Sequence, residues 1–306
     1  MKKLFLLILF LSKPSFAACG ISILASSVPI SWNQNFNFQP VTFTVTKSQE
    51  PACSVGLTFT SGGGASYTAR RMTAGSAVMG YQLFRDSALT QVLKDYPDLN
   101  STSDFELVSF PKGKNLSQTL TYYIKIPQTA QLNPSGTYAD SFNIKAYEGS
   151  NFSSYLNPVT VAAVSVSAVV PKVVALSLVG AGQGFSPTST AQSLNFGTLV
   201  NGAVLGFDLL VQSNAGFAIT FSSQHNGMLT NSSPDIKTVV SYGMQVDSSA
   251  KNLSSSASTP VIVATGSGQT TVSGNRHNIA VTIGSVDSTM AGTYSDNITV
   301  TATTTE

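Results

Sequence analysis

Few side chains in this sequence could perform catalysis or bind a metal ion. The two histidines, His225 and His277, lie in polar stretches far from both cysteines, and a zinc site would need more ligands than these residues supply. Serine is abundant, but the sequence contains no Gly-x-Ser-x-Gly motif of the kind that exposes a nucleophile between a strand and a helix. We therefore predict a protein that is not an enzyme and has no cofactor.

A group of carboxylates is the remaining candidate for a metal site. A solvated loop explains these residues best, and weak calcium binding is the alternative. The residues are Asp95, Asp98, Asp104 and Glu106.

The composition favours a β-rich fold. Only 10% of the 306 residues are charged, against about 25% in an average globular chain, while 42% are hydrophobic. Such a chain is too apolar to be disordered and too poor in charge to hold nucleic acid electrostatically. Because Glu, Lys and Arg are scarce and β-branched residues are frequent, we expect an all-β fold without nucleic acid as a partner.

The first 17 residues are predicted to be a secretory signal peptide. A positive start at Lys2 and Lys3 precedes the apolar run 4–11, and small residues at positions 15 and 17 fit a cleavage site. Without Lys2, Lys3 and Lys13, 13 of the 16 basic residues remain against 14 acidic ones, a net charge of −1. Lipid modification of Cys19 is a rival interpretation of this region.

The two cysteines are expected to form one disulfide. Cys19 and Cys53 are an even pair in a chain predicted to enter an oxidising compartment. Closing a loop of this length should stabilise the fold by about 3–4 kcal/mol. The bond would also tie the mature N-terminus to the first domain.

The two halves of the chain resemble each other. Three pairs of segments match in the same order, with offsets of 162, 161 and 156 residues. Three collinear matches indicate two copies of one domain. The pairs are Val55–Ser61 with Phe217–Ser223, Tyr81–Ser87 with Tyr242–Ser248, and Gly136–Asp140 with Gly292–Asp296.

One difference between the copies is decisive. After each Gly-Thr-Tyr motif, apolar and polar residues alternate as in a half-buried strand. In the first copy another alternating apolar run, 159–170, follows and would close the sandwich, whereas the second copy stops at Glu306. We predict two tandem immunoglobulin-like β-sandwiches, 18–170 and 171–306, of which the second lacks its last strand.

A sandwich without its last strand exposes an apolar groove and unpaired backbone groups, so it needs a strand from another chain. A donated strand that buried roughly 500 Å² of apolar surface would contribute about 12 kcal/mol at most. We expect the acceptor groove to be lined by the first and last strands of the second domain. The expected residues are Val173, Val174, Leu176, Leu178, Tyr294, Ile298, Val300 and Ala302.

The N-terminal copy resembles the spore coat protein U domain, the pilin-type domain of archaic (Csu-type) chaperone–usher pili. The matching segments are Cys53–Val55, Arg70–Met72, Tyr81–Asp86 and Gly136–Asp140. The C-terminal copy lacks the cysteines and the Arg-Met element. In this family two-domain subunits are tip adhesins, so the resemblance implies export through the periplasm and a position at the pilus tip. It also implies three partners: a periplasmic chaperone, an outer-membrane usher and a subunit that donates a strand.

The aromatic residues suggest where the first domain would bind a surface or a host receptor. Residues 18–170 contain 18 aromatic residues and 171–306 contain seven, and aromatic side chains are enriched at binding surfaces. Plugging the ends of the sandwich is the alternative role. The candidate contact residues are Trp32, Phe36, Phe38, Tyr67, Leu93, Tyr96, Leu99, Phe152 and Tyr155.

Two other functions remain open on the sequence alone. One is a structural pilus or coat subunit of the same family with no adhesive role. The other is a secreted β-sandwich module that binds carbohydrate. The ligand itself is also open: the aromatic excess favours hydrophobic surfaces, and a glycan is the second choice.

Overall fold

The computed structural model describes residues 19–33, 36–127, 132–155, 157–233, 235 and 237–305. The predicted signal peptide, 1–17, lies outside these residues. The described chain forms two compact units, each considered separately below. Unit 1 runs to Pro127 and resumes over Tyr138–Ala168, whereas unit 2 takes Gln128–Thr137 and everything from Val169. The sequence prediction instead placed the boundary after residue 170.

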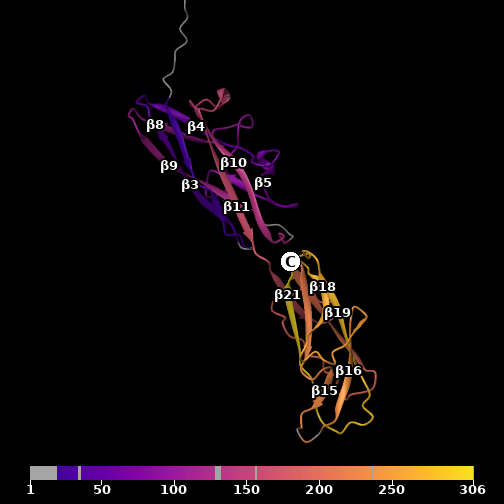
Figure 1. Ribbon diagram of the computed structural model, residues 1–306. Helices are drawn as coiled ribbons and strands as arrows, with labels where there is room; N and C mark the ends of the chain where they lie inside the picture. The colour runs from indigo at the N-terminus through magenta and orange to yellow at the C-terminus, as the bar shows by residue number, and fades with distance from the viewer. Residues whose placement is uncertain are drawn as a thin grey trace, which may run out of the picture. The chain divides into compact units, whose positions relative to one another are not determined.

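Unit 1 is a β-sandwich of two sheets. The first sheet has the order β1-β3-β9-β7 and the second β2-β11-β10-β4-β8, with β5 and β6 as a hairpin beside β10 (Figure 1). The strands are β1 (Ile21–Ala25), β2 (Val28–Ile30), β3 (Phe38–Lys47), β4 (Cys53–Phe59), β5 (Arg71–Ala74), β6 (Ala77–Gly80), β7 (Gln82–Phe84), β8 (Glu106–Phe110), β9 (Leu116–Lys125), β10 (Gly136–Glu148) and β11 (Thr160–Val170).

The helices within the described ranges are two short 3₁₀ turns, η1 (Tyr67–Ala69) and η2 (Phe152–Ser154). Neither is long and apolar enough to cross a membrane. Helical structure therefore contributes little to either unit, as the scarcity of strong helix formers led us to expect.

The strand β11 completes the sandwich of unit 1. Its inward residues Val164, Val166, Ala168 and Val170 are buried, while the alternate positions are mostly exposed. One edge of β11 lies beside β10 and the other pairs with β2 in parallel. The chain thus supplies its own closing strand in the first copy of the domain.

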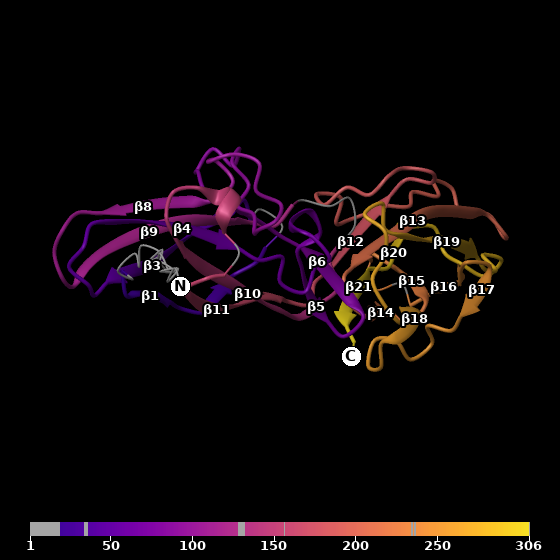
Figure 2. The same cartoon turned by 90° about the horizontal axis from the view of Figure 1, so that it is seen from above.

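Unit 2 is also a sandwich of two sheets, but it has no counterpart of β11 among the residues that the structure describes. Its larger sheet has the order β12-β13-β19-β16-β15-β20, with β17 beside β16, and its smaller sheet is β18-β14-β21. Figure 2 labels the strands of this unit from β12 to β21. The strands are β12 (Val174–Val179), β13 (Val204–Ser213), β14 (Phe217–Ser223), β15 (Met228–Asn231), β16 (Val239–Val246), β17 (Ser249–Lys251), β18 (Val261–Gly266), β19 (Asn275–Ile283), β20 (Tyr294–Ser295) and β21 (Ile298–Thr304).

The strand register confirms the internal repeat. In unit 1, Phe59 on β4 lies opposite Ile144 on β10. Adding the sequence offsets of 162 and 156 gives Phe221 and Val300, and these two residues lie opposite each other on β14 and β21. The glycines of the two Gly-Thr-Tyr motifs also share a positive φ, 152° at Gly136 and 159° at Gly292, which glycine adopts without steric cost.

The predicted fold class is confirmed: the chain is all-β, with two tandem sandwiches, and the second is incomplete. Among the residues that the structure describes, β21 has a single neighbour, β14, and no counterpart of β11 lies on its other edge. The last strand of unit 2 therefore has one free edge.

Candidate functional site

A groove with a volume of about 1440 Å³ runs along the free edge of β21. One wall comes from β21 and the other from β12 and the segment 190–199. Seven of the eight residues expected from the sequence line it: Val174, Leu176, Leu178, Tyr294, Ile298, Val300 and Ala302.

Val173 is not part of the groove lining, which corrects the sequence expectation. It precedes β12, its side chain is exposed, and its backbone N–H donates a 2.8 Å hydrogen bond to Asn214 Oδ1. This bond holds Val173 at the entry to β12.

The groove residues of β21 are apolar but only half-buried. Ile298, Val300 and Ala302 face the core and pack against it, yet none is fully buried. Their counterparts on β10 at an offset of 156 are Phe142, Ile144 and Ala146, each with an exposed fraction of 0%. The difference follows from β11, which covers these positions in unit 1 and has no equivalent among the described residues of unit 2.

The second wall includes two residues that sequence reasoning missed, Leu194 and Phe196. Both are half-buried, pack against the core of unit 2 and line the groove, while Ser193 and Asn195 beside them are exposed. The period-two alternation was visible in the sequence, but a polar, glycine-containing stretch surrounds it and hid the signal.

The backbone of segment 191–199 in this wall has almost no hydrogen-bond partners, whereas β12 is paired with β13. In the stretch 191–199, all of which the structure describes, the one hydrogen bond runs from the Gly197 N–H to Asn195 Oδ1, at 2.9 Å. Earlier in the same connection, the Leu178 N–H donates to Ser189 O at 2.7 Å. Segment 191–199 is thus held by the side chains of Leu194 and Phe196, and most of its N–H and C=O groups remain available to a strand.

A buried carboxylate marks one end of the groove. Asp296 lines it and accepts hydrogen bonds from the hydroxyls of Tyr242 and Ser223, both at 2.6 Å. His225 Nδ1 lies 3.1 Å from the same carboxylate. Burial, followed by the hydrogen bond to Asp296, raises the pKa of Tyr242 well above its ordinary value. Tyr242 therefore stays protonated and acts as a hydrogen-bond donor.

The structure corrects part of the contact surface expected in unit 1. Leu93, Leu99 and Tyr155 are buried, with exposed fractions of 0%, 7% and 1%, so their side chains are unavailable to a partner. Leu99 and Tyr155 belong to a small second core with Phe105 and Tyr147, where the rings of Tyr147 and Tyr155 stack at 4.7 Å.

The other contact candidates are half-buried and lie in separate places. Tyr96 and Phe152 border the second core, and the Tyr67 ring lies under Lys94 Nζ at 4.9 Å. Trp32 follows β2, which runs parallel to β11 with Ile30 opposite Ala168. It therefore lies at the end of the sandwich where β11 finishes.

Two further aromatic candidates follow Trp32 in the chain. Phe36 and Phe38 are half-buried. Phe38 begins β3 opposite Lys125, and its ring meets that of Tyr123 edge-on at 5.7 Å. Phe38 thus packs on Tyr123, whereas Tyr96 and Phe152 border the second core.

The carboxylates of the 95–106 region are used in ion pairs. Asp95 pairs with Lys145 at 2.6 Å, and Asp104 pairs with Lys94 at 3.0 Å. Glu106 pairs with Arg85 at 3.2 Å. No group of metal-binding side chains occurs anywhere in the described ranges.

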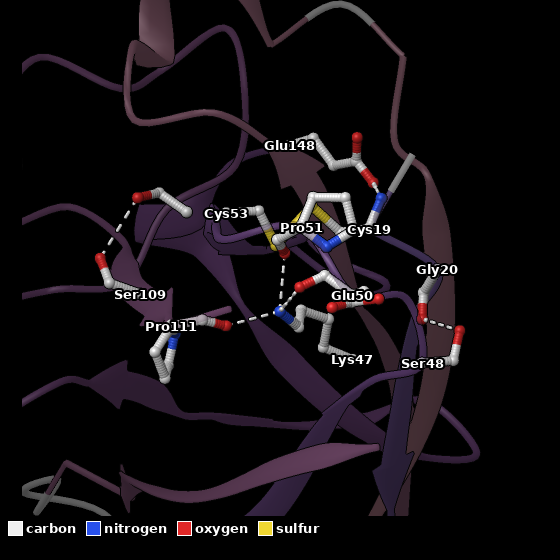
Figure 3. The surroundings of a disulfide bond; sticks show 11 residues. Cys19, Gly20, Lys47, Ser48, Glu50, Pro51, Cys53, Ser109, Pro111 and Glu148 are labelled. Carbon is white, nitrogen blue, oxygen red and sulfur yellow. Dashed lines mark hydrogen bonds between the residues drawn. A yellow bond between two sulfur atoms is a disulfide. The ribbon is translucent and has the colours of Figure 1, made fainter. Parts of the chain in front are cut away.

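The disulfide expected between Cys19 and Cys53 is present (Figure 3). Since Cys19 Sγ is bonded to Cys53, it has no free thiol for lipid attachment, which counts against the rival interpretation. The Cys19 N–H also donates to Glu148 Oε1 at 2.5 Å. The start of the described chain is thus fixed at this end of unit 1.

Beside the disulfide lies Lys47, whose exposed fraction is 0%. Its ammonium donates to three backbone carbonyls, Pro111 O at 2.6 Å, Pro51 O at 2.7 Å and Glu50 O at 3.4 Å (Figure 3). A buried charge is tolerated when its hydrogen bonds are satisfied. Lys47 thereby holds two loops together.

Comparison with known families agrees with the sequence resemblance. Residues 17–145 match the family model "Spore Coat Protein U domain". The resemblance stated from the sequence is thus confirmed over this part of the chain. None of the curated proteins matches this sequence.

Several solved structures are similar to the whole chain at low identity. A chain of the CsuC–CsuE chaperone–tip adhesion subunit pre-assembly complex of Acinetobacter baumannii is 15% identical, with a TM-score of 0.45, covering 92% of this chain and 99% of that one. The CupB6 tip adhesin of Pseudomonas aeruginosa is 12% identical, with a TM-score of 0.39 and coverage of 92% and 95%. A mutant of the CFA/I adhesin CfaE of enterotoxigenic E. coli is 11% identical, with a TM-score of 0.40 and coverage of 92% of both chains.

Proposed function

We propose that this protein, whose N-terminal half contains a Spore Coat Protein U domain, is a non-enzymatic adhesin at the tip of a chaperone–usher pilus. Unit 2 anchors it to the fibre by accepting a strand from the next subunit. Unit 1 binds an abiotic surface or a host receptor. The protein is exported through the periplasm and ends at the cell surface.

One observation carries this proposal: the half-buried row Ile298, Val300 and Ala302 beside an unpaired strand edge. The same positions in unit 1 are fully buried because β11 covers them. The molecule thus contains both the open and the closed form of one sandwich. An exposed apolar groove with free backbone groups is the feature that β-strand addition completes.

The partners follow from the need to protect this groove. Before assembly a periplasmic chaperone would cover it, and the outer-membrane usher would exchange the chaperone for the extension of another subunit. Unit 1 is already closed by β11 and needs no donor, so it is free for recognition.

The groove is tested by expressing residues 18–306 alone, with a candidate chaperone, and with a donor strand fused to the C-terminus. We expect aggregation or incomplete folding of the chain alone, and a soluble monomer when the strand is fused. The control carries the same fusion with aspartate at the inward positions. A chain that is a stable monomer without any donor, with both units unfolding cooperatively, would overturn the proposal and favour a secreted carbohydrate-binding module.

The adhesive role is tested separately in cells that assemble the pilus. We propose Trp32, Phe36 and Phe38 as one contact group, and the half-buried Tyr67, Tyr96 and Phe152 as the other candidates. Alanine at all three residues of the first group should reduce surface attachment while the fibres remain normal in number. Phe152→Ala is the comparison at a separate site.

The outcome of this second test separates an adhesin from a structural subunit. Attachment that is unchanged by substitution of both groups, on intact fibres, would favour a structural or coat role. Because Phe38 packs on Tyr123, the thermal stability of each variant is measured as well, so that unfolding is not mistaken for loss of binding.

A further inference from the structure

The two units allow a residue-by-residue comparison of an open groove with a filled one. Strands β3 and β13 are both ten residues long. When they are aligned with an offset of 166 residues, Phe43 corresponds to Leu209 and Val45 to Val211. All four side chains are buried. The same offset places Val28 on Leu194 and Ile30 on Phe196. The segment around Leu194 and Phe196 therefore corresponds to β2, the strand that pairs with β11.

Compared with unit 1, one wall of the groove carries larger side chains and the other carries smaller ones. On the wall that corresponds to β2, valine and isoleucine of unit 1 become the larger Leu194 and Phe196. On the β21 wall, Phe142 and Ile144 of unit 1 correspond to the smaller Ile298 and Val300. Relative to unit 1, the groove thus has less space beside Leu194 and Phe196 and more space beside Ile298 and Val300.

These differences in side-chain size affect which strand can bind, because β11 packs closely against its neighbours in unit 1. Val166 lies opposite Val28, and Ala168 lies opposite Ile30, with every one of these side chains at most 3% exposed. Closely packed protein interiors are destabilised when a larger side chain is introduced. A strand with the sequence of β11 would meet Phe196 where it now meets Ile30, and would leave space beside Ile298.

We infer that Leu194 and Phe196, with Ile298 and Val300 on the opposite wall, determine which strand the groove accepts. The preferred strand carries small side chains along Leu194 and Phe196 and larger ones toward β21. The groove excludes strands of the β11 type, including β11 of a second copy of this chain. This inference rests on the proposed function, because it assumes that the groove receives a strand.

The test uses the full mature chain with a copy of Thr160–Val170 fused to its C-terminus. A flexible linker as long as the loop between β10 and β11 joins the two. The wild-type groove is compared with a variant carrying Leu194→Val, Phe196→Ile, Ile298→Phe and Val300→Ile, which restores the residues of unit 1. The fraction of soluble monomer and the Tm of unit 2 are measured.

The fused β11 copy should leave the wild-type chain mostly aggregated and should convert the four-residue variant into a soluble monomer. Equal rescue of both chains would overturn the inference while leaving strand acceptance intact. Failure to rescue the variant would also overturn it. A different result would contradict the proposed function: a wild-type chain that is a stable monomer without any fused strand.

A reciprocal exchange in unit 1 guards against a variant that simply misfolds. Val28→Leu together with Ile30→Phe gives β2 the side chains that Leu194 and Phe196 supply in unit 2. These larger side chains then face β11 within unit 1. The Tm of unit 1 should fall by roughly 5 °C as a result of overpacking. An unchanged Tm would show that β11 tolerates the larger wall, which contradicts the inference.

Discussion

The Tyr81 hydroxyl donates a 2.7 Å hydrogen bond to Asp140 Oδ2, and the same bond recurs at 2.6 Å between Tyr242 and Asp296. Each pair joins the aspartate two positions after the Gly-Thr-Tyr motif to a tyrosine more than fifty positions earlier in the chain. In unit 1, burial and then the bond to Asp140 raise the pKa of Tyr81 above its ordinary value. The tyrosine therefore remains a donor at physiological pH.

Removing either hydroxyl should destabilise its own unit. Tyr81→Phe and Tyr242→Phe each leave a carboxylate oxygen without this donor, and a hydrogen bond to a charged group contributes about 1.5–3 kcal/mol. Urea unfolding of the strand-complemented protein measures the loss. Tyr123→Phe is the matched control, since Tyr123 is half-buried and its hydroxyl has no hydrogen bond to any residue that the structure describes. A loss as large in the control would show that the Tyr–Asp bond is not the cause.

A charge in the groove should prevent partner binding without affecting unit 1. Ile298→Asp puts a carboxylate where an apolar donor side chain would pack, and burial of an unpaired charge is strongly unfavourable. We expect loss of the chaperone-bound protein in periplasmic extracts, while residues 18–170 still fold. Thr301→Asp, on the exposed face of the same strand and outside the groove lining, should accumulate normally. An undiminished complex with Ile298→Asp would show that the groove is assigned to the wrong edge.

Tyr122→Phe should stabilise unit 1. The Tyr122 hydroxyl is buried, has no hydrogen-bond partner in the described structure, and its pKa is raised by that burial. An unsatisfied buried polar group costs about 1–3 kcal/mol, so its removal should increase the free energy of unfolding by about 1 kcal/mol. The ring contacts with Phe43 and Phe59 are retained in the variant. A decrease in stability would indicate a partner such as a bound water.

Acid should loosen the 85–105 loop. Partial burial acts to raise the pKa of Asp104, but the Asn100 N–H, the Lys94 ammonium and the Ser101 N–H outweigh it and hold the pKa below its ordinary value of 3.8. A carboxylate with a lowered pKa stabilises the fold above its unfolded-state pKa and loses that contribution as the pH falls. The protection factors of the loop amides, which correct hydrogen exchange for its intrinsic pH dependence, should therefore fall below about pH 4. In Asp104→Asn the loop should exchange faster at neutral pH and respond less to acid.

The sequence was sufficient for features that follow from strand periodicity. Alternation after Tyr138 and Tyr294 identified the strands that became β10 and β21, and alternation over 159–170 identified β11. The unpaired edge of β21 followed directly from comparing the two copies. These predictions succeeded because a half-buried strand has a two-residue period that one sequence displays.

Features that depend on contacts between loops were not predictable in this way. Leu99 and Tyr155 looked like exposed loop residues, but the loops at 95–105 and 149–158 pack against each other and bury both. Leu194 and Phe196 were missed for a related reason. Their alternation is too short to indicate a strand, and only their correspondence with Val28 and Ile30 shows their position in the groove wall.

The setting of Lys47 has a consequence for how unit 1 responds to salt. Its ammonium is buried and stabilised by hydrogen bonds to three carbonyl groups. Dissolved salt should therefore screen it much less than the exposed contact between Lys112 and Glu50. The covalently linked end of unit 1 should accordingly keep its shape from fresh water to brine.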